Sequence, residues 1–355
     1  MRVLITGACG VTSRAVVRSL RISPKFQALH LVGTDICENP YALYEGLLDR
    51  IYRVPRVTDP GYHPLMEEIC RRERLEAAIV IPELEVLYWA RARLPIPAAL
   101  PPSGFCQIAV SKQRLYEALI GTGLAPEFRI CARAELLDAP ARDWRLPCWI
   151  RDFAEGSSSG KGSLLAHNAE ELRAWAVLNS GTRNFMLSDY LPGRNFACHL
   201  LYDRGRIVKV ASYERMEYFM ARTAVSGVTG NISKGRLVND PRLESAADAA
   251  IAAILKQTGE TMHGIVAVDF REAASGDPLV TEINLRHVAA TYSFAAAGFN
   301  LAEAQLLLTL GRTDELGPRE ATFPKRNMIF RDIDGAPVWL AEYEEPAVGK
   351  SIEKR

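Results

Sequence analysis

Several common functional patterns are absent from this sequence of 355 residues. The seven cysteines form no C-x-x-C pair and the six histidines form no H-x-x-x-H pair, which argues against a zinc site or a zinc-peptidase helix. The net charge is only +1, so no excess of either sign indicates a nucleic acid or a membrane surface as partner. No hydrophobic run is long enough to cross a bilayer.

The cysteines are scattered and odd in number, which favours free thiols in a reducing compartment over a disulfide framework. The first residues, MRVLITGACG, predict a strand followed by a glycine turn rather than a signal peptide. We therefore expect a cytoplasmic protein. The length predicts two or three domains, and 48% hydrophobic with 24% charged residues is ordinary for a globular chain.

The first glycine motif, TGACGVTS, lacks the features of a nicotinamide site. The G-x-G-x-x-G spacing is missing, because only Gly7 and Gly10 are present and Ser13 replaces a third glycine. Asp35 stands where a ribose-binding acid would, but no tyrosine has a lysine four residues later, as an NAD-dependent epimerase needs. We interpret the glycines as a tight turn from strand to helix, with a bound dinucleotide as the alternative.

Strands and helices alternate over roughly the first hundred residues, which predicts a parallel, doubly wound sheet. The strands are expected at 2–6, at LHLVGTD and in the apolar run 77–81, and 94–104 is expected to be a proline-rich connector. Farther along, Ser111 and Asn168 are expected to cap helices, the first ending at Gly121 or Gly123. A strand is expected at 147–153, one long helix at 291–310, and hairpins at 196–214, 264–286 and 327–343.

The segment VDFREAASGDPLVTEINLR carries the strongest chemical signal. Residues two apart on a strand point to the same face, so Glu282, Asn284 and Arg286 line one side, and the antiparallel partner can bring Asp269 opposite them. Two carboxylates and an amide oxygen are hard ligands suited to magnesium. An arginine beside them can neutralise a charged transferring group. A solvated strand face is the alternative interpretation.

A second candidate is the loop EGSSSGKGS, residues 155–163, which is rich in glycine, serine and lysine. It fails the P-loop pattern, since Gly156 and Gly160 enclose three residues rather than four, and Gly162 stands where Ser or Thr should hold magnesium. Its composition nevertheless suits a mobile loop whose backbone N–H groups close on phosphates. The alternative is an exposed connector without a ligand.

Taken in order, SKQRLYEAL, PCWIRDFAEGSSSGKGS, FMLSDYLPGRNF and VDF followed by TEINLR resemble the motifs of the ATP-grasp superfamily, in its carbamoyl-phosphate-synthase-like branch. The resemblance covers about residues 1–310. It implies a mixed α/β and α+β fold: a Rossmann-like pre-ATP-grasp domain at 1–104 and a two-lobed ATP-grasp fold after it. The lobes would be a helical linker with a lid subdomain, 105–190, and a C-terminal subdomain with the metal site and a tail hairpin, 191–355.

The resemblance also implies roles for particular residues. ATP would be contacted by basic residues, the serine-glycine loop and a hinge strand: Lys112, Arg151, Ser157, Ser158, Ser159, Gly160, Lys161, Gly162, Ser163, Asp189, Tyr190, Leu191 and Asn195. Mg²⁺, with Mn²⁺ as an alternative, would be held by Asp269, Glu282 and Asn284. Arg286 would hold an acyl phosphate. The loop 222–235 would lie at the substrates, with Arg222, Ser226 and Lys234 either as carboxylate contacts or as solvated residues.

Two features depart from the family pattern. The hinge acid is Asp189 rather than Glu, and Gly193-Arg194-Asn195 replaces Gly-x-Glu, which removes the usual ribose-binding carboxylate. The chain also holds one grasp unit, whereas a carbamoyl phosphate synthase large subunit holds two. The resemblance therefore implies a relative with another substrate.

The expected activity is that of an ATP-dependent carboxylate–amine ligase, which forms an acyl phosphate and releases ADP and phosphate. Its partners would be small carboxylate and amine substrates such as amino acids, not nucleic acids or membranes. A homodimer is left open. The competing hypothesis is a non-catalytic or regulatory ATP-grasp protein that binds nucleotide without turnover.

Overall fold

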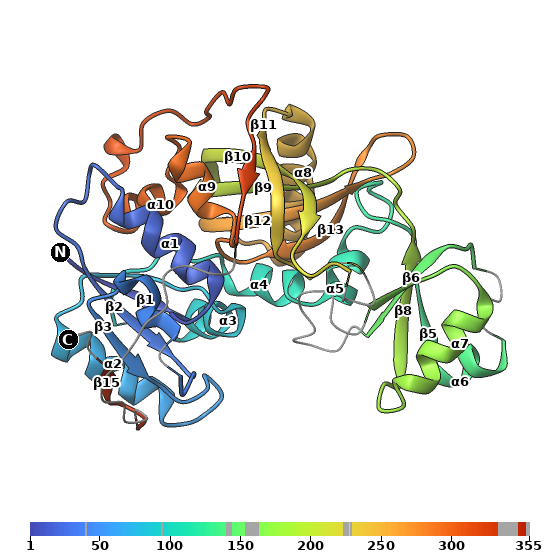
Figure 1. The fold of residues 1–355 in the computed structure, drawn as a ribbon, viewed down its shortest axis with the longest axis horizontal. Coiled ribbons are helices and arrows are strands. Elements are labelled where there is room, and N and C mark those ends of the chain that lie inside the picture. Colours follow the sequence, from blue (N-terminus) through green and yellow to red (C-terminus); the bar gives the residue numbers. More distant parts are fainter. Residues whose placement is uncertain are drawn as a thin grey trace.

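The computed structural model describes residues 1–39, 41–93, 95–139, 144–152, 163–222, 227, 229–332 and 347–352. The described strands form three sheets. Figure 1 shows the second of them in chain order set apart from the other two at one end of the molecule. We call them sheets A, B and C. No helix in the described ranges is long and apolar enough to span a membrane.

Sheet A lies at the N-terminal end and has the strand order β15-β3-β2-β1-β4. The expected doubly wound arrangement is confirmed, because β1 runs parallel to both β2 and β4, and β2 parallel to β3; only the edge strand β15 is antiparallel. Buried apolar side chains in β1 and β4 place both strands in the core. The elements are β1 (Arg2–Thr6), α1 (Val11–Arg21), β2 (His30–Asp35), η1 (Tyr41–Gly46), β3 (Arg50–Arg53), α2 (Tyr62–Glu73), β4 (Ala77–Ile79), α3 (Glu83–Ala92) and β15 (Ser351–Ile352).

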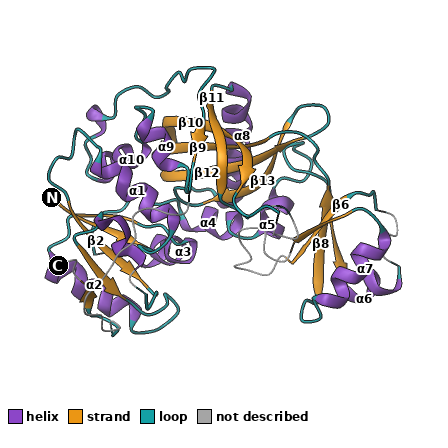
Figure 2. Ribbon diagram, in the orientation of Figure 1, coloured by secondary structure: helices purple, strands orange, loops and turns teal. Residues whose placement is uncertain are grey.

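Two short helices, α4 (Ser103–Ala109) and α5 (Lys112–Ala118), lead from sheet A to sheet B. Sheet B is antiparallel, with the order β5-β8-β6-β7, and Figure 2 shows α6 and α7 packed beside it. Ser111 and Asn168 cap α5 and α7 as expected, each accepting a backbone N–H with its side chain. The elements are β5 (Phe128–Ala132), α6 (Arg133–Asp138), β6 (Cys148–Asp152), β7 (Ser163–Ala166), α7 (Ala169–Leu178) and β8 (Asn184–Asp189).

Sheet C is the largest, with the order β13-β12-β9-β10-β11-β14. The two expected hairpins, β9–β10 and β12–β13, are both present, and α8 packs on the sheet. The elements are β9 (Asn195–Asp203), β10 (Arg206–Tyr218), β11 (Ile232–Val238), α8 (Pro241–Thr258), β12 (Gly264–Glu272), β13 (Pro278–Asn284), α9 (Thr291–Ala296), α10 (Leu301–Thr309), η2 (Thr313–Glu315) and β14 (Ile329–Phe330).

Three expectations need correction or stay open. The single helix expected at 291–310 is wrong: α9 and α10 are separate, because Gly298 has a φ of +85° and the Asn300 side chain caps a new helix. The helix capped by Ser111 ends at Ala118, before the glycines. The expected tail hairpin stays open. Its first strand, β14, pairs with β11, and 333–346, where the second strand was expected, lie outside the described residues.

The buried core joins sheets A and C, and most buried side chains of sheet B form a core of their own. One cluster contains Leu4 and Val32 of sheet A together with Cys198 and Val266 of sheet C. Helix α1 packs against α9 and α10, which brings the start of the chain onto its C-terminal half. The site described next lies where sheets A and C meet.

Candidate active site

The acids expected to bind metal lie side by side on β12 and β13. In the register of this hairpin Asp269 is directly opposite Glu282, and Ala267 is opposite Asn284. Directly opposite residues share a face of an antiparallel pair, as do residues two apart, so the three polar side chains lie on one face. The pairing predicted from sequence is therefore present in the fold.

Each of the two carboxylates is held by a cation. Lys112 Nζ donates to Glu282 Oε2 at 2.7 Å, and Arg215 Nη2 donates to Asp269 Oδ1 at 2.5 Å. Burial alone would raise the pKa of Glu282, but Lys112 holds it below its usual value, whereas burial keeps the pKa of Asp269 raised despite Arg215. Among the described residues, no hydrogen bond reaches the second oxygen of either carboxylate.

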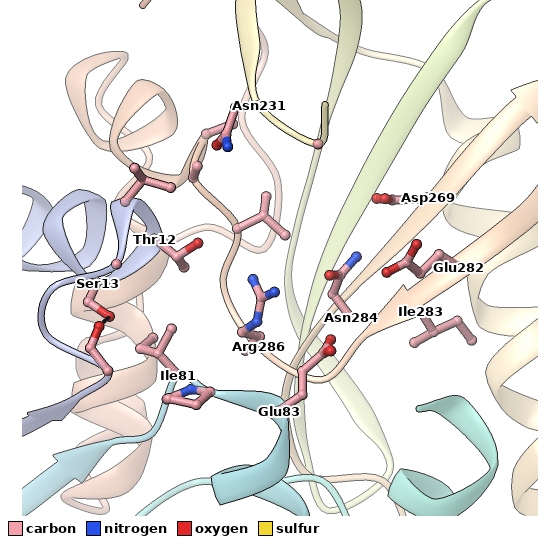
Figure 3. Close-up of a pocket in the computed structure, with 18 of the residues that line it drawn as sticks. Thr12, Ser13, Ile81, Glu83, Asn231, Asp269, Glu282, Ile283, Asn284 and Arg286 are labelled. Atoms are coloured by element: carbon pink, nitrogen blue, oxygen red, sulfur yellow. Dashed lines mark hydrogen bonds between the residues drawn. The ribbon is translucent and has the colours of Figure 1, made fainter. Parts of the chain in front are cut away.

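These residues line a cavity of about 480 Å³ between sheets A and C. Figure 3 shows Asp269, Glu282 and Asn284 along one side, with Thr12 and Ser13 across the space from them. Tyr213 and Arg215 of β10 also line it. The cavity is thus bounded by Asp269 and Glu282 at one end and by the start of α1 at the other.

Glu83 and Arg286 occupy the middle of the cavity. Both line it, and Figure 3 shows the Glu83 carboxylate near Asn284 and Arg286. Burial raises the pKa of the Glu83 carboxyl, and the guanidinium of Arg286 acts against that rise. Arg286 Nη1 donates to the His287 carbonyl at 2.9 Å, which helps to fix the guanidinium. A carboxylate and a guanidinium therefore face the space between the acids and α1.

The glycine turn after β1 forms the far wall. Gly7 has a φ of +60°, and a Cβ there would lie 2.6 Å from Pro82, so the tight turn expected from sequence does require glycine. Gly7 and Gly10 also line the cavity. Gly7 follows β1 and packs against Pro82, which lies just after β4. The strand order of sheet A reverses between β1 and β4, and crevices at such points bind ligands in open α/β sheets.

The residues expected to contact the adenine and ribose lie at the junction of sheets B and C. Asp189 ends β8 and accepts from Arg145 at 3.2 Å, while the buried Leu191 accepts from Arg271 through its carbonyl at 3.1 Å. Tyr190 lies between them. Asn195 begins β9 and donates from Nδ2 to the Tyr218 hydroxyl at 2.6 Å. The Asn195 amide, which stands where the family pattern has a ribose-binding carboxylate, is therefore hydrogen-bonded to a tyrosine.

The second basic residue, Arg151, belongs to sheet B, and neither Arg151 nor Ser163 is part of the cavity lining. Arg151 lies on β6 with its guanidinium over the Trp149 ring, and Ser163 is its partner on β7. The residues between these strands, including Ser157, Ser158, Ser159, Gly160, Lys161 and Gly162, lie outside the described residues.

Two further candidates are not brought to the acids. Lys234, on β11, forms an ion pair with Glu217 at 3.2 Å. Arg222 is exposed in the segment after β10, and Ser226 lies outside the described residues. Neither Lys234 nor Arg222 is part of the cavity lining.

Sequence reasoning missed three charged residues of this cavity, namely Arg215, Glu83 and Arg331. The only available signal for Arg215 was its two-residue spacing from Tyr213, which puts both on one face of β10. Glu83 begins α3 and Arg331 follows β14, so only the packing of separate elements brings them to the acids.

No family model matches the chain, and no curated protein matches it. Among solved structures it is similar to L-amino acid ligase from Bacillus licheniformis, with 13% identity, a TM-score of 0.62, and 90% of this chain and 75% of that chain covered. It is also similar to phosphoribosylamine–glycine ligase from Thermotoga maritima, with 15% identity, a TM-score of 0.64, and 90% of this chain and 78% of that chain covered. A third similar structure is D-alanine–D-alanine ligase from Bacillus anthracis, with 14% identity, a TM-score of 0.55, and 89% of this chain and 100% of that chain covered.

The chain has the ATP-grasp fold. The sequence resemblance predicted this fold, including the Rossmann-like unit that precedes it. Identities of 13–15% show a shared architecture, so what this site binds and does is a separate question.

Proposed function

We propose that the protein is an ATP-dependent ligase that joins a carboxylate to an amine through an acyl phosphate, releasing ADP and phosphate. The observation that carries the proposal is the cavity of an ATP-grasp fold in which Asp269 and Glu282 stand beside Lys112, Arg215 and Arg286. Three cations and two acids on one cavity suit a reaction in which negative phosphate and carboxylate groups must approach each other.

The donor atoms fit a magnesium ion. Asp269, Glu282 and Asn284 offer hard oxygen ligands on one face, and one oxygen of each carboxylate has no hydrogen bond among the described residues. When bound, Mg²⁺ would offset phosphate charge. Mn²⁺ takes similar ligands and is an alternative.

The chain's own cations would position the phosphate groups. Lys112 would move from Glu282 towards the phosphates, and Arg286 would hold the acyl phosphate. In the first step a substrate carboxylate oxygen attacks the γ-phosphorus and the bond to ADP breaks. In the second, the amine nitrogen attacks the acyl carbon, phosphate leaves, and the nitrogen loses a proton to give the amide. Glu83 would face the incoming amine from beside Arg286 in the middle of the cavity.

The remaining site assignments are part of the same proposal. ATP would lie between sheets B and C, with its adenine at Asp189, Tyr190 and Leu191, its ribose near Asn195, and its phosphates near Arg151 and the 157–163 loop. Lys234 and Arg222 would bind a substrate carboxylate. For Lys234 this requires that it leave its ion pair with Glu217.

The test is ADP release from ATP and Mg²⁺ in the presence of pairs of the twenty amino acids. One or more pairs should raise ADP release well above the rate with ATP alone. Nucleotide binding without ADP release for any pair, measured by calorimetry in parallel, would favour the regulatory alternative.

A further inference from the structure

Cys9 and Cys37 differ from the other cysteines of the chain. Both are partly exposed, whereas the remaining five are buried: Cys70, Cys106, Cys131, Cys148 and Cys198. Buried thiols are inert because oxidants cannot reach them, so redox chemistry on this chain would concentrate on the exposed pair.

The two cysteines lie on neighbouring loops that one carboxylate ties together. Asp35, at the end of β2, accepts from the Cys9 backbone N–H at 2.8 Å and from the Cys37 backbone N–H at 2.9 Å. The Cys9 sulfur lies 3.7 Å from the Asn39 carbonyl oxygen, so its side chain points at the loop that carries Cys37. Burial and Asp35 raise the pKa of the Cys9 thiol, and Cys37 adds to that rise, as expected for two thiols that lie near each other.

We propose that Cys9 and Cys37 form a reversible disulfide that clasps the glycine turn to the loop after β2. A disulfide needs sulfur atoms about 2.05 Å apart and Cβ atoms about 3.8 Å apart. Two loops whose backbone N–H groups bind the same Asp35 carboxylate can bring the thiols to that separation by a shift of the loops. In a reducing compartment such a bond is transient, which is typical of redox-sensing pairs.

The chemistry balances with a low-molecular-weight disulfide as oxidant. The Cys37 thiolate attacks that disulfide, forming a mixed disulfide and releasing one small thiol. The Cys9 thiolate then attacks the Cys37 sulfur and releases the second small thiol, so two protein thiols are oxidised and one small disulfide is reduced to two thiols. Burial, reinforced by Asp35, raises the pKa of the Cys9 thiol, which makes it the slower partner and speeds bond formation at higher pH.

The clasp would act on the cavity because Cys9 lies inside the turn that lines it. Gly7 and Gly10 line the cavity, and Cys9 stands between them in the chain. Tightening the turn onto the loop after β2 shifts this wall while leaving the acids on β12 and β13 in place. On the proposed function, oxidation therefore raises the KM of the substrate at this wall several-fold and changes kcat less.

The direct test measures the bond without activity. The full chain is incubated with oxidised glutathione, alkylated, digested and mapped by mass spectrometry. Of the seven thiols, two should be lost and the five buried ones kept, with one cross-linked peptide pair, Cys9 to Cys37, that dithiothreitol reverses. Cys37→Ser should abolish the cross-link, and the matched control Cys70→Ser should leave it unchanged.

Seven alkylated cysteines after oxidation, or glutathione adducts on both residues without a cross-link, would overturn the clasp. A cross-link with unchanged KM would overturn its effect on the cavity. A cross-link in a chain that never releases ADP would support the clasp and reject the ligase, so the two failures are distinguishable.

Discussion

At the scale of single residues, the site is held in electrostatic balance by its own cations. The Lys112–Glu282 and Arg215–Asp269 pairs are both largely buried, with no side chain more than 28% exposed. Removing one partner of a buried pair leaves an uncompensated charge, which costs about 3–5 kcal/mol in the interior. On the proposed function, incoming phosphate and metal charges would take over both roles, so the pairs would preorganise the site for a charged ligand.

Replacing the carboxylate of Glu282 tests this balance. Glu282→Gln should lower ADP release by about 100-fold or more, since the loss of a metal ligand removes charge at the phosphates. The thermal midpoint should fall by several degrees because Lys112 loses its buried partner, but the fold should persist because the amide keeps the side chain's shape. The matched control is Glu217→Gln, which removes an exposed ion-pair partner of Lys234 and should keep most activity. Equal activity of the two variants would refute the metal-site assignment.

A pH effect on stability should come from the buried histidines. Burial lowers the pKa of His199 from 6.5 to about 3 and that of His287 to about 4. The unfolded chain binds these protons below about pH 6.5 while the folded chain does not, so stability is full above that pH and falls as pH drops towards 4. Each histidine contributes a slope of about 1.4 kcal/mol per pH unit.

Urea unfolding measured between about pH 5 and pH 7.5 checks this slope. His199→Phe should reduce it by about 1.4 kcal/mol per pH unit, while His167→Phe, at an exposed position, should leave it unchanged. A slope that is unchanged by His199→Phe would show that other groups cause the pH dependence.

The sequence predicted those site residues whose spatial neighbours follow from their spacing along the chain. Glu282 and Asn284 are two apart on one strand, and the short turn of the hairpin brings Asp269 to them. Arg215 and Glu83 could not be predicted in this way, because their places depend on which strands pair and on how sheet A packs against sheet C.

At the scale of elements, the hairpins followed from sequence because a two-residue alternation and a short turn specify both strands. The break between α9 and α10 did not, since the pattern is helical on both sides and one glycine inside a helix is often tolerated. Gly298 here adopts a left-handed conformation that ends α9, and Asn300 starts α10.

A close approach at Gly193 positions the junction between sheets B and C. The Gly193 N–H donates to the Glu272 carbonyl at 3.0 Å, and an added Cβ would lie 2.5 Å from the Glu272 Cβ and 2.8 Å from its carbonyl oxygen. Gly193→Ala should therefore destabilise the fold by about 1–3 kcal/mol in urea unfolding. Gly181→Ala, where nothing lies within 4 Å, should change stability little. Similar values for the two variants would show that the junction is looser than described.

At the scale of the whole molecule, the shared core of sheets A and C fixes the cavity walls, while sheet B keeps a separate core. The Rossmann-like unit therefore contributes a wall of the site, through Gly7, Gly10 and Glu83, as well as a scaffold. The sequence predicted this unit and the ATP-grasp fold after it. It did not predict that the glycine turn and the acids share one cavity, because that depends on packing between distant parts of the chain.

The central claim is that ATP is split between its β- and γ-phosphates to form an acyl phosphate. The most direct measurement follows ATP by phosphorus NMR with the active carboxylate, Mg²⁺ and hydroxylamine in place of the amine. We predict ADP, inorganic phosphate and a hydroxamate formed in equal amounts, each about 100-fold or more slower with Glu282→Gln. AMP and pyrophosphate as the main products would contradict it, even though the fold would stand.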